Sequence, residues 1–154
     1  MSTRTGERQQ PWSDEPVEQG RILVLSDNPI ARSIAVIAST VGRTVVVEAA
    51  DDGGPGLDPR RGDAVVLCDH DAPDAPGVLR AALASDAAYV AMMASRGRAA
   101  GLLDDLVAEG VDVTTLHVPA GHDLGGKAPG EIALSVVAEI VAESYGRTGG
   151  PMRG

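Results

Sequence analysis

Aromatic side chains are nearly missing from this chain. Its 154 residues include no Phe, one Trp and two Tyr. A core without large aromatic rings must be filled by Val, Ile, Leu and Ala, and short runs of these residues suit a parallel β-sheet covered by helices. The length leaves room for one domain of about 120 residues.

Cysteine and positive charge are also scarce. Cys68 stands alone, which excludes an internal disulfide and any metal site made of cysteines only. Lys and Arg number 13 against 22 Asp and Glu, for a net charge of -9. Nonspecific binding to nucleic acid or to an anionic membrane needs clustered positive charge, so we expect neither partner.

Long apolar runs are the third absence. None approaches the roughly 18 residues of a membrane-spanning helix, and the N-terminus has no signal-peptide-like apolar stretch, so we expect a cytoplasmic protein. Residues 1–20 are polar and predicted to be a disordered leader, and 146–154 a flexible tail. Residues 21–145 remain as a single domain.

Within that domain, apolar runs alternate with helical patterns. The predicted strands are 21–25, 44–48, 64–68, 88–92 and 113–118, and the predicted helices are 29–41, 75–84, 98–109 and 129–145. This alternation predicts an α/β fold, a Rossmann-like doubly wound parallel sheet. Residues 51–62 lack apolar periodicity, and we expect a loop there in place of a helix.

The last predicted helix has an unusual pattern. Its polar residues fall four apart, at Glu131, Ser135, Glu139 and Glu143, and almost everything between them is apolar. Such a helix must be covered on more than one side. We therefore expect a homodimer or a stable subcomplex with another protein.

Ligands of such sheets bind at the carboxyl ends of the strands. In the first loop there, Ser26, Asn28 and Ala31 occupy the positions where a dinucleotide fold has G-x-G-x-x-G. The residues stay small, but the glycines are gone and Asp27 adds negative charge. Binding of NAD or NADP in the usual pose is therefore disfavoured.

The loop after the third predicted strand carries His70 between Asp69 and Asp71. A histidine among carboxylates can bind a metal or relay protons. The alternative, which we favour, is a turn whose Asp residues cap the next helix.

The loop after the fourth predicted strand holds Ser95, Arg96 and Arg98. It leads into a helix N-terminus, where backbone N–H groups and the helix dipole favour an anion, and arginines add charge-assisted contacts. The alternative is that one arginine pairs with Asp104 or Asp105.

The glycine-rich loop before the last helix is a fourth candidate. Gly121 lets the backbone approach a ligand closely, and Asp123 lies beside it. Histidines such as His117 and His122 are more often hydrogen-bonding surface residues than ligands, and three unclustered histidines do not make a metal site.

Two stretches carry a family resemblance: YVAMMASRGR at 89–98 and PAGHDLGGKAPGEIALSVVAEIVAE at 119–143. Together they resemble the C-terminal Rossmann domain of the XdhC/CoxI family over about residues 21–145. The second stretch matches the family pattern at Pro119, Gly121, Asp123, Gly125, Pro129, Glu131, Ile132, Ala133, Ser135, Ala138 and Glu139. His122 stands where the family has Leu, and Ala128 where it has Thr.

The resemblance implies a non-catalytic maturation factor for a molybdenum hydroxylase such as xanthine dehydrogenase or carbon monoxide dehydrogenase. It implies transient binding of a molybdopterin-type molybdenum cofactor, help with its sulfuration, and delivery to the apo-enzyme. A separate protein carrying the family's N-terminal domain, or a cysteine desulfurase, is a further implied partner. The residues expected to contact the cofactor are Ser26, Asn28, His70, Ser95, Arg96, Gly121 and Asp123.

The chain departs from the family in its first loop, which lacks glycines, and at Ala91 and Ala94, where glycine is usual. We also expect this protein to lack the family's separate N-terminal domain with its cysteine.

Two other readings stay open. The run LVLSDNPIAR at 23–32, with Asp69 and Pro73, resembles a receiver domain with Asp69 as phosphoacceptor, although Val118 stands where a receiver has lysine. A nicotinamide-dependent oxidoreductase domain is the enzyme alternative.

Overall fold

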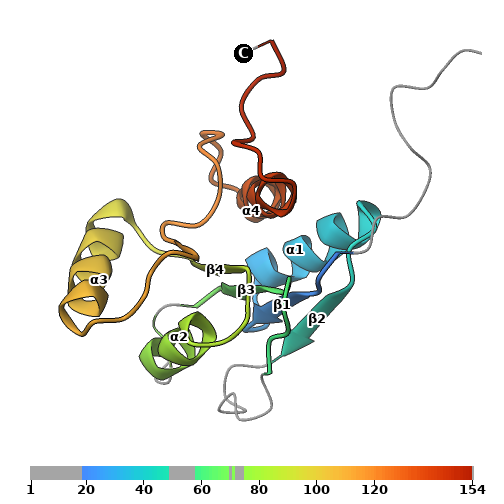
Figure 1. Ribbon diagram of the computed structural model, residues 1–154. Coiled ribbons are helices and arrows are strands. Elements are labelled where there is room, and N and C mark those ends of the chain that lie inside the picture. The colour runs from blue at the N-terminus through green and yellow to red at the C-terminus, as the bar shows by residue number, and fades with distance from the viewer. Residues whose placement is uncertain (1–18, 49–57, 70, 72–74, 154) are drawn as a thin grey trace, which may run out of the picture.

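The computed structural model describes residues 19–48, 58–69, 71 and 75–153, and within them the predicted α/β fold is confirmed (Figure 1). The strands are β1 Ile22–Leu25, β2 Val45–Glu48, β3 Ala64–Leu67, β4 Tyr89–Met92 and β5 Leu116–His117. The helices are α1 Pro29–Thr40, α2 Ala75–Leu83, α3 Arg96–Ala108 and α4 Pro129–Ser144. Their order along the chain follows the predicted alternation.

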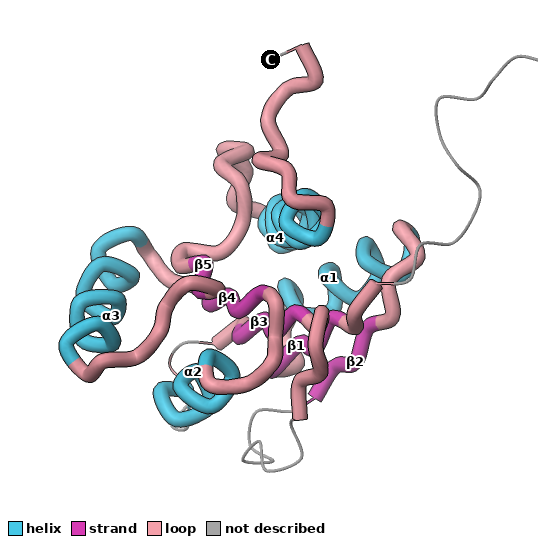
Figure 2. Tube along the Cα trace, in the orientation of Figure 1, coloured by secondary structure: helices cyan, strands magenta, loops and turns pink. Residues whose placement is uncertain are grey.

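All strand pairs are parallel, and the sheet has the order β2-β1-β3-β4-β5. Helices α1 and α4 cover one face, and α2 and α3 cover the other (Figure 2). The strand order reverses between β1 and β3, the doubly wound arrangement in which ligands are expected near that point. No described helix is long and apolar enough to cross a membrane.

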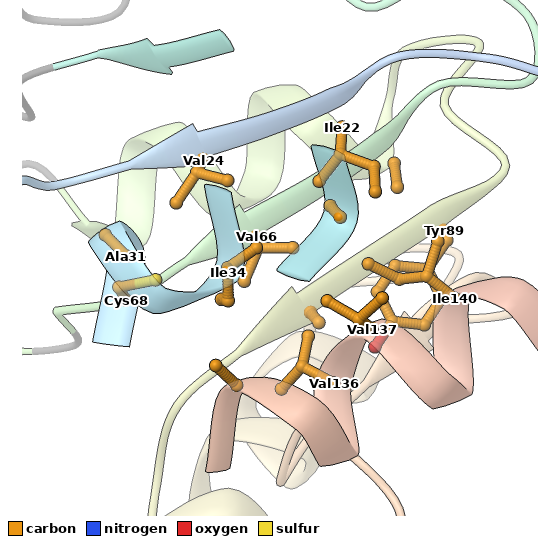
Figure 3. Packing of buried hydrophobic residues seen from close by; sticks show 14 residues of the cluster. Ile22, Val24, Ala31, Ile34, Val66, Cys68, Tyr89, Val136, Val137 and Ile140 are labelled. Carbon is orange, nitrogen blue, oxygen red and sulfur yellow. The ribbon is translucent and has the colours of Figure 1, made fainter. Parts of the chain in front are cut away.

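The three central strands are buried on both faces, as a parallel sheet between helices requires. Aliphatic side chains fill the α1–α4 side: Figure 3 shows Ile34, Val66 and Val137 gathered there, with Tyr89 beside Ile140. The expected aliphatic core is confirmed, and the only buried aromatic side chain among the described residues is Tyr89.

Two element boundaries differ from the sequence prediction in ways that matter for the site. Helix α3 begins at Arg96, two residues before the predicted start, because the Ser95 side chain caps it by accepting from the Arg98 N–H at 3.2 Å. Strand β5 has only two residues instead of the predicted 113–118. Residues 58–62 form no helix, as expected, and the rest of the predicted 51–62 loop lies outside the described residues.

Helix α4 turns part of its polar stripe inward. Ser135 is 7% exposed and the Glu139 side chain 14% exposed, because the chain after β5 folds back over them. The apolar residues beside the stripe pack on the sheet and on α1, which is the neighbouring helix. Much of the cover that the sequence assigned to a partner is therefore supplied within the chain.

Candidate functional site

A hollow of about 410 Å³ opens where the chain leaves β4 and β5. One wall is Arg96, in the first turn of α3. The other walls are the segment from Pro119 to Asp123, which connects β5 to the approach of α4. Three predicted site residues thus meet at one place: Arg96 from the loop after β4, and Gly121 and Asp123 from the glycine-rich loop.

Arg96 and Asp123 face each other across the hollow. The guanidinium Nη2 lies 3.6 Å from Asp123 Oδ2, and the two side chains are 86% and 81% exposed. A pair so exposed contributes little to folding stability. The guanidinium therefore stays accessible to an anion, next to the N-terminal amides of α3.

The neighbouring residues of α3 have structural contacts. Ser95 lies next to the hollow, but its hydroxyl is used as the helix cap. Arg98 donates to Asp71 Oδ1 at 3.1 Å. Arg96 pairs with Asp123 and Arg98 pairs with Asp71. The alternative prediction, in which one of these arginines pairs with Asp104 or Asp105, is therefore wrong.

Ser26 and Asn28 do not line this hollow. Asn28 caps α1 through its Oδ1, which accepts from the Ala31 N–H at 2.9 Å, and its Nδ2 donates to the Cys68 carbonyl at 3.1 Å. Both polar ends of the side chain are thus occupied: Oδ1 caps α1, and Nδ2 joins the ends of β1 and β3. Ser26 has a left-handed φ of 90°, and its N–H donates to the Glu48 carbonyl.

His70 lies outside the described residues, so its predicted role stays a prediction. Within the part of the chain that is described, no group of three or more His, Cys, Asp or Glu side chains could hold a metal ion. Burial raises the pKa of the Cys68 thiol to about 12, and a thiol of this kind is neither a nucleophile nor a ready metal ligand near neutral pH.

A second polar cluster lies under α4, and none of its carboxylates was among the predicted site residues. Glu139 Oε1 accepts from the Tyr89 hydroxyl at 2.6 Å and from the Gly121 N–H at 3.0 Å. His117 stacks on the Tyr89 ring, with centroids 4.4 Å apart. Its Nδ1 lies 3.6 Å from Glu139 Oε2, and its Nε2 lies 3.1 Å from Glu143 Oε1. His117 is therefore a half-buried link between two carboxylates, not a surface residue.

The charge of Glu139 is held by its surroundings. Burial disfavours the carboxylate, but the contacts with His117, Tyr89 and the Gly121 N–H outweigh it and lower the pKa of Glu139 from 4.5 to about 2. One clue in the sequence pointed here: a buried tyrosine needs a partner for its hydroxyl, and Tyr89 is one of only two tyrosines.

His122 is placed more deeply than expected. It lines the hollow, yet its Nε2 is buried and has no hydrogen-bond partner among the described residues. The reason is Gly149, which lies so close to the imidazole that a Cβ at position 149 would overlap Nε2. Part of the predicted tail thus covers a wall residue of the hollow, while residues 146–153 form neither helix nor strand.

The whole hollow lies within a recognisable family domain. A model of the XdhC Rossmann domain matches residues 22–140, from β1 into the last turns of α4. This chain belongs to the XdhC Rossmann domain family. The resemblance predicted from residues 89–98 and 119–143 is confirmed.

Two known proteins are similar to this chain. The uncharacterized protein YqeB of Escherichia coli K12 is 37% identical over 68 residues, which are 42% of this chain and 13% of that protein. A Bacillus halodurans crystal structure described as a xanthine dehydrogenase superposes with a TM-score of 0.69 at 20% identity, covering 84% of this chain and 44% of that one. At this identity the likeness shows the fold. The chain spans less than half the length of either relative.

Proposed function

We propose that this XdhC-family domain is a non-catalytic accessory protein in the cytoplasmic maturation of a molybdenum hydroxylase. The client would be an apo-enzyme of the xanthine dehydrogenase or carbon monoxide dehydrogenase type. The family match supports the class of function, and the name of the Bacillus halodurans relative supports a xanthine dehydrogenase context. The proposal that the hollow is the ligand site rests on one observation: Arg96, Gly121 and Asp123 line the same hollow.

The chemistry of the hollow fits a pterin that bears a phosphate. Arg96 and the N-terminal amides of α3 offer a guanidinium and N–H donors to the phosphate. The Asp123 carboxylate accepts hydrogen bonds, which suits the N–H edge of a pterin ring. Gly121 keeps the backbone close to α4, since a Cβ there would overlap the Ser135 hydroxyl. The bound cofactor would supply the molybdenum chemistry to the client, and the domain would hold and release it.

Handover would require other proteins. A separate protein with the family's N-terminal domain, or a cysteine desulfurase, would act with this chain during sulfuration of the cofactor. The apo-enzyme would then take the cofactor from the hollow, which is open to solvent at Arg96 and Asp123.

The test compares two arginines of the same helix turn. Arg96→Ala removes the charge at the hollow, whereas Arg98→Ala removes a charge that pairs with Asp71. Loss of a charge-assisted hydrogen bond costs about 1.5–3 kcal/mol, or roughly 10- to 100-fold in affinity. Titration calorimetry with molybdopterin should show this loss for Arg96→Ala and less than about a threefold change for Arg98→Ala.

Cofactor loading of the client gives an independent readout. Co-expression with the molybdenum hydroxylase encoded nearest to this chain should yield less active, less molybdenum-loaded enzyme for Arg96→Ala than for Arg98→Ala. Equal pterin affinity and equal client loading for the two variants would contradict the assignment of the hollow.

A further inference from the structure

The segment that forms most of the hollow is held by three successive backbone amides. The Ala120 N–H donates to the Met92 carbonyl at 3.2 Å, the Gly121 N–H to Glu139 Oε1 at 3.0 Å, and the His122 N–H to the Ser135 carbonyl at 3.2 Å. Two of these acceptors are backbone carbonyls of β4 and α4. Only the acceptor at Gly121 is a side chain, so a substitution can remove it selectively.

Glu139 is itself held by residues of two strands, β4 and β5. Tyr89 from β4 donates to the same oxygen that Gly121 uses, and His117 from β5 lies against the other oxygen. Glu143, one turn later on α4, holds the far side of the His117 ring. The carboxylate therefore has one preferred place, and the glycine-rich segment is built onto it.

The contact between Glu139 and Gly121 affects the hollow through the backbone that follows Gly121. Asp123 is two residues after Gly121 and faces Arg96 at 3.6 Å. Gly121 has a left-handed φ of 98°, so the direction in which the chain leaves this residue depends on how its peptide groups are held. Without the Glu139 contact, the wall that carries His122 and Asp123 has one anchor fewer.

We propose that Glu139 is a positioning residue of the hollow: its carboxylate, braced by Tyr89 and His117, holds the Gly121 amide and thereby sets the wall opposite Arg96. This inference rests on the proposed function of the hollow as an anion-binding site. Glu139 belongs to the inward-facing part of the α4 polar stripe, and it shapes the hollow through the loop that packs on it.

The experiment uses sulfate as the probe, because its charge stays constant from pH 4 to 8. Sulfate affinity is measured by NMR titration of the whole chain and of three variants. Glu139→Leu removes the acceptor for Gly121. Val137→Ala is the matched control, since it weakens the packing of α4 on the sheet and leaves every hydrogen bond of Glu139 in place. Arg96→Ala removes the anion partner.

Glu139→Leu should weaken sulfate binding about tenfold and speed hydrogen exchange at the Gly121 amide more than at amides of the α4 core. Val137→Ala should stay within about twofold of the natural chain in sulfate affinity, although it also lowers the stability of the fold. If Glu139 has a purely structural role, Glu139→Leu should lower hydrogen-exchange protection evenly along the chain. Its sulfate affinity should then equal that of the control variant. If Glu139→Leu does not fold, Glu139→Gln carries the test: its weaker neutral acceptor should cost about threefold in affinity and move the Gly121 amide proton upfield.

The outcomes separate the two proposals. Sulfate binding that is lost in Arg96→Ala but kept in Glu139→Leu, or in Glu139→Gln where that variant carries the test, overturns the positioning role and leaves the anion site standing. Sulfate binding that Arg96→Ala does not change, or that the natural chain does not show, overturns the anion site and the positioning role together.

Discussion

The Tyr89 hydroxyl donates to Glu139 Oε1 at 2.6 Å, across 50 residues of sequence. This bond joins the first residue of β4 to the C-terminal half of α4. It lies at the side of the core where Tyr89 packs beside Ile140 (Figure 3). Burial, and after it the Glu139 carboxylate, raises the pKa of Tyr89, so the phenol remains a donor at all physiological pH values. The bond lets a charged side chain that is only 14% exposed lie against an aliphatic core, because its carboxylate has hydrogen-bond partners there.

Glu139 should make folding stability depend on acid. Its pKa is about 2 in the folded chain against 4.5 as a reference, so its contribution is fully present above pH 4.5 and is lost as pH falls toward 2. The lowered pKa corresponds to at most about 3 kcal/mol of stability at neutral pH. Urea unfolding of the natural chain and Glu139→Gln should show a difference at pH 7 that shrinks steadily below pH 4.5. A difference that is the same at pH 7 and pH 3 would contradict this assignment.

Asn28 should act as a structural residue. Asn28→Ala removes the cap of α1 and the bond to the Cys68 carbonyl, and we expect a loss of about 1–2 kcal/mol of stability. Asn28→Asp keeps the capping oxygen and should lose less. Sulfate affinity at the hollow should not change in either variant. If Asn28→Ala instead loses sulfate binding while its stability against denaturant stays unchanged, Asn28 is a residue of the binding site.

Dinucleotides should bind poorly. The positions of the missing glycines hold Ser26, Asn28 and Ala31, and the Asn28 side chain already bridges the ends of β1 and β3 where a pyrophosphate would approach. We expect dissociation constants for NAD and NADP from roughly high micromolar to millimolar. Calorimetry that gave low-micromolar binding of either nucleotide would refute this prediction.

The contact between Gly149 and His122 can be opened by one methyl group. Gly149→Ala has no room for its Cβ and also strains a backbone with φ of 81°, so the segment around it should move off the imidazole. Carbethoxylation of His122, followed by peptide mass spectrometry, should then proceed several times faster. Gly150→Ala is the control, since a Cβ there meets only an ordinary contact at 3.6 Å. Equal rates for both variants would show that Gly149 does not shield His122.

Assembly remains a prediction. Leu134 on α4 is 49% exposed, and the neighbouring helix α1 exposes Val36, with Val41 exposed at its C-cap. We expect sedimentation at micromolar concentration to give a particle heavier than the 15.7 kDa monomer. Leu134→Glu should dissociate it, whereas Leu103→Glu, on α3 across the sheet, should not. A clean, soluble monomer for the natural chain would rule out self-association.

The fold was readable from the sequence because its signals are local. Apolar runs at 64–68 and 88–92 mark strands buried on both faces, and Asn28 followed by Pro29 marks a helix start. Three of the predicted site residues, Arg96, Gly121 and Asp123, also meet as a parallel sheet requires, since its loops gather at the carboxyl ends of the strands.

Tertiary structure alone decided which polar groups serve the fold and which face the hollow. Ser26 and Asn28 follow β1, where a ligand-binding loop is expected. The Asn28 side chain, however, caps α1 and donates to the Cys68 carbonyl. Glu139 lies 18 residues beyond Gly121 in the chain and still holds its amide. No local pattern encodes such a contact, because the hydrogen bond exists only once α4 has packed on the sheet and excluded the water that would otherwise compete for the carboxylate.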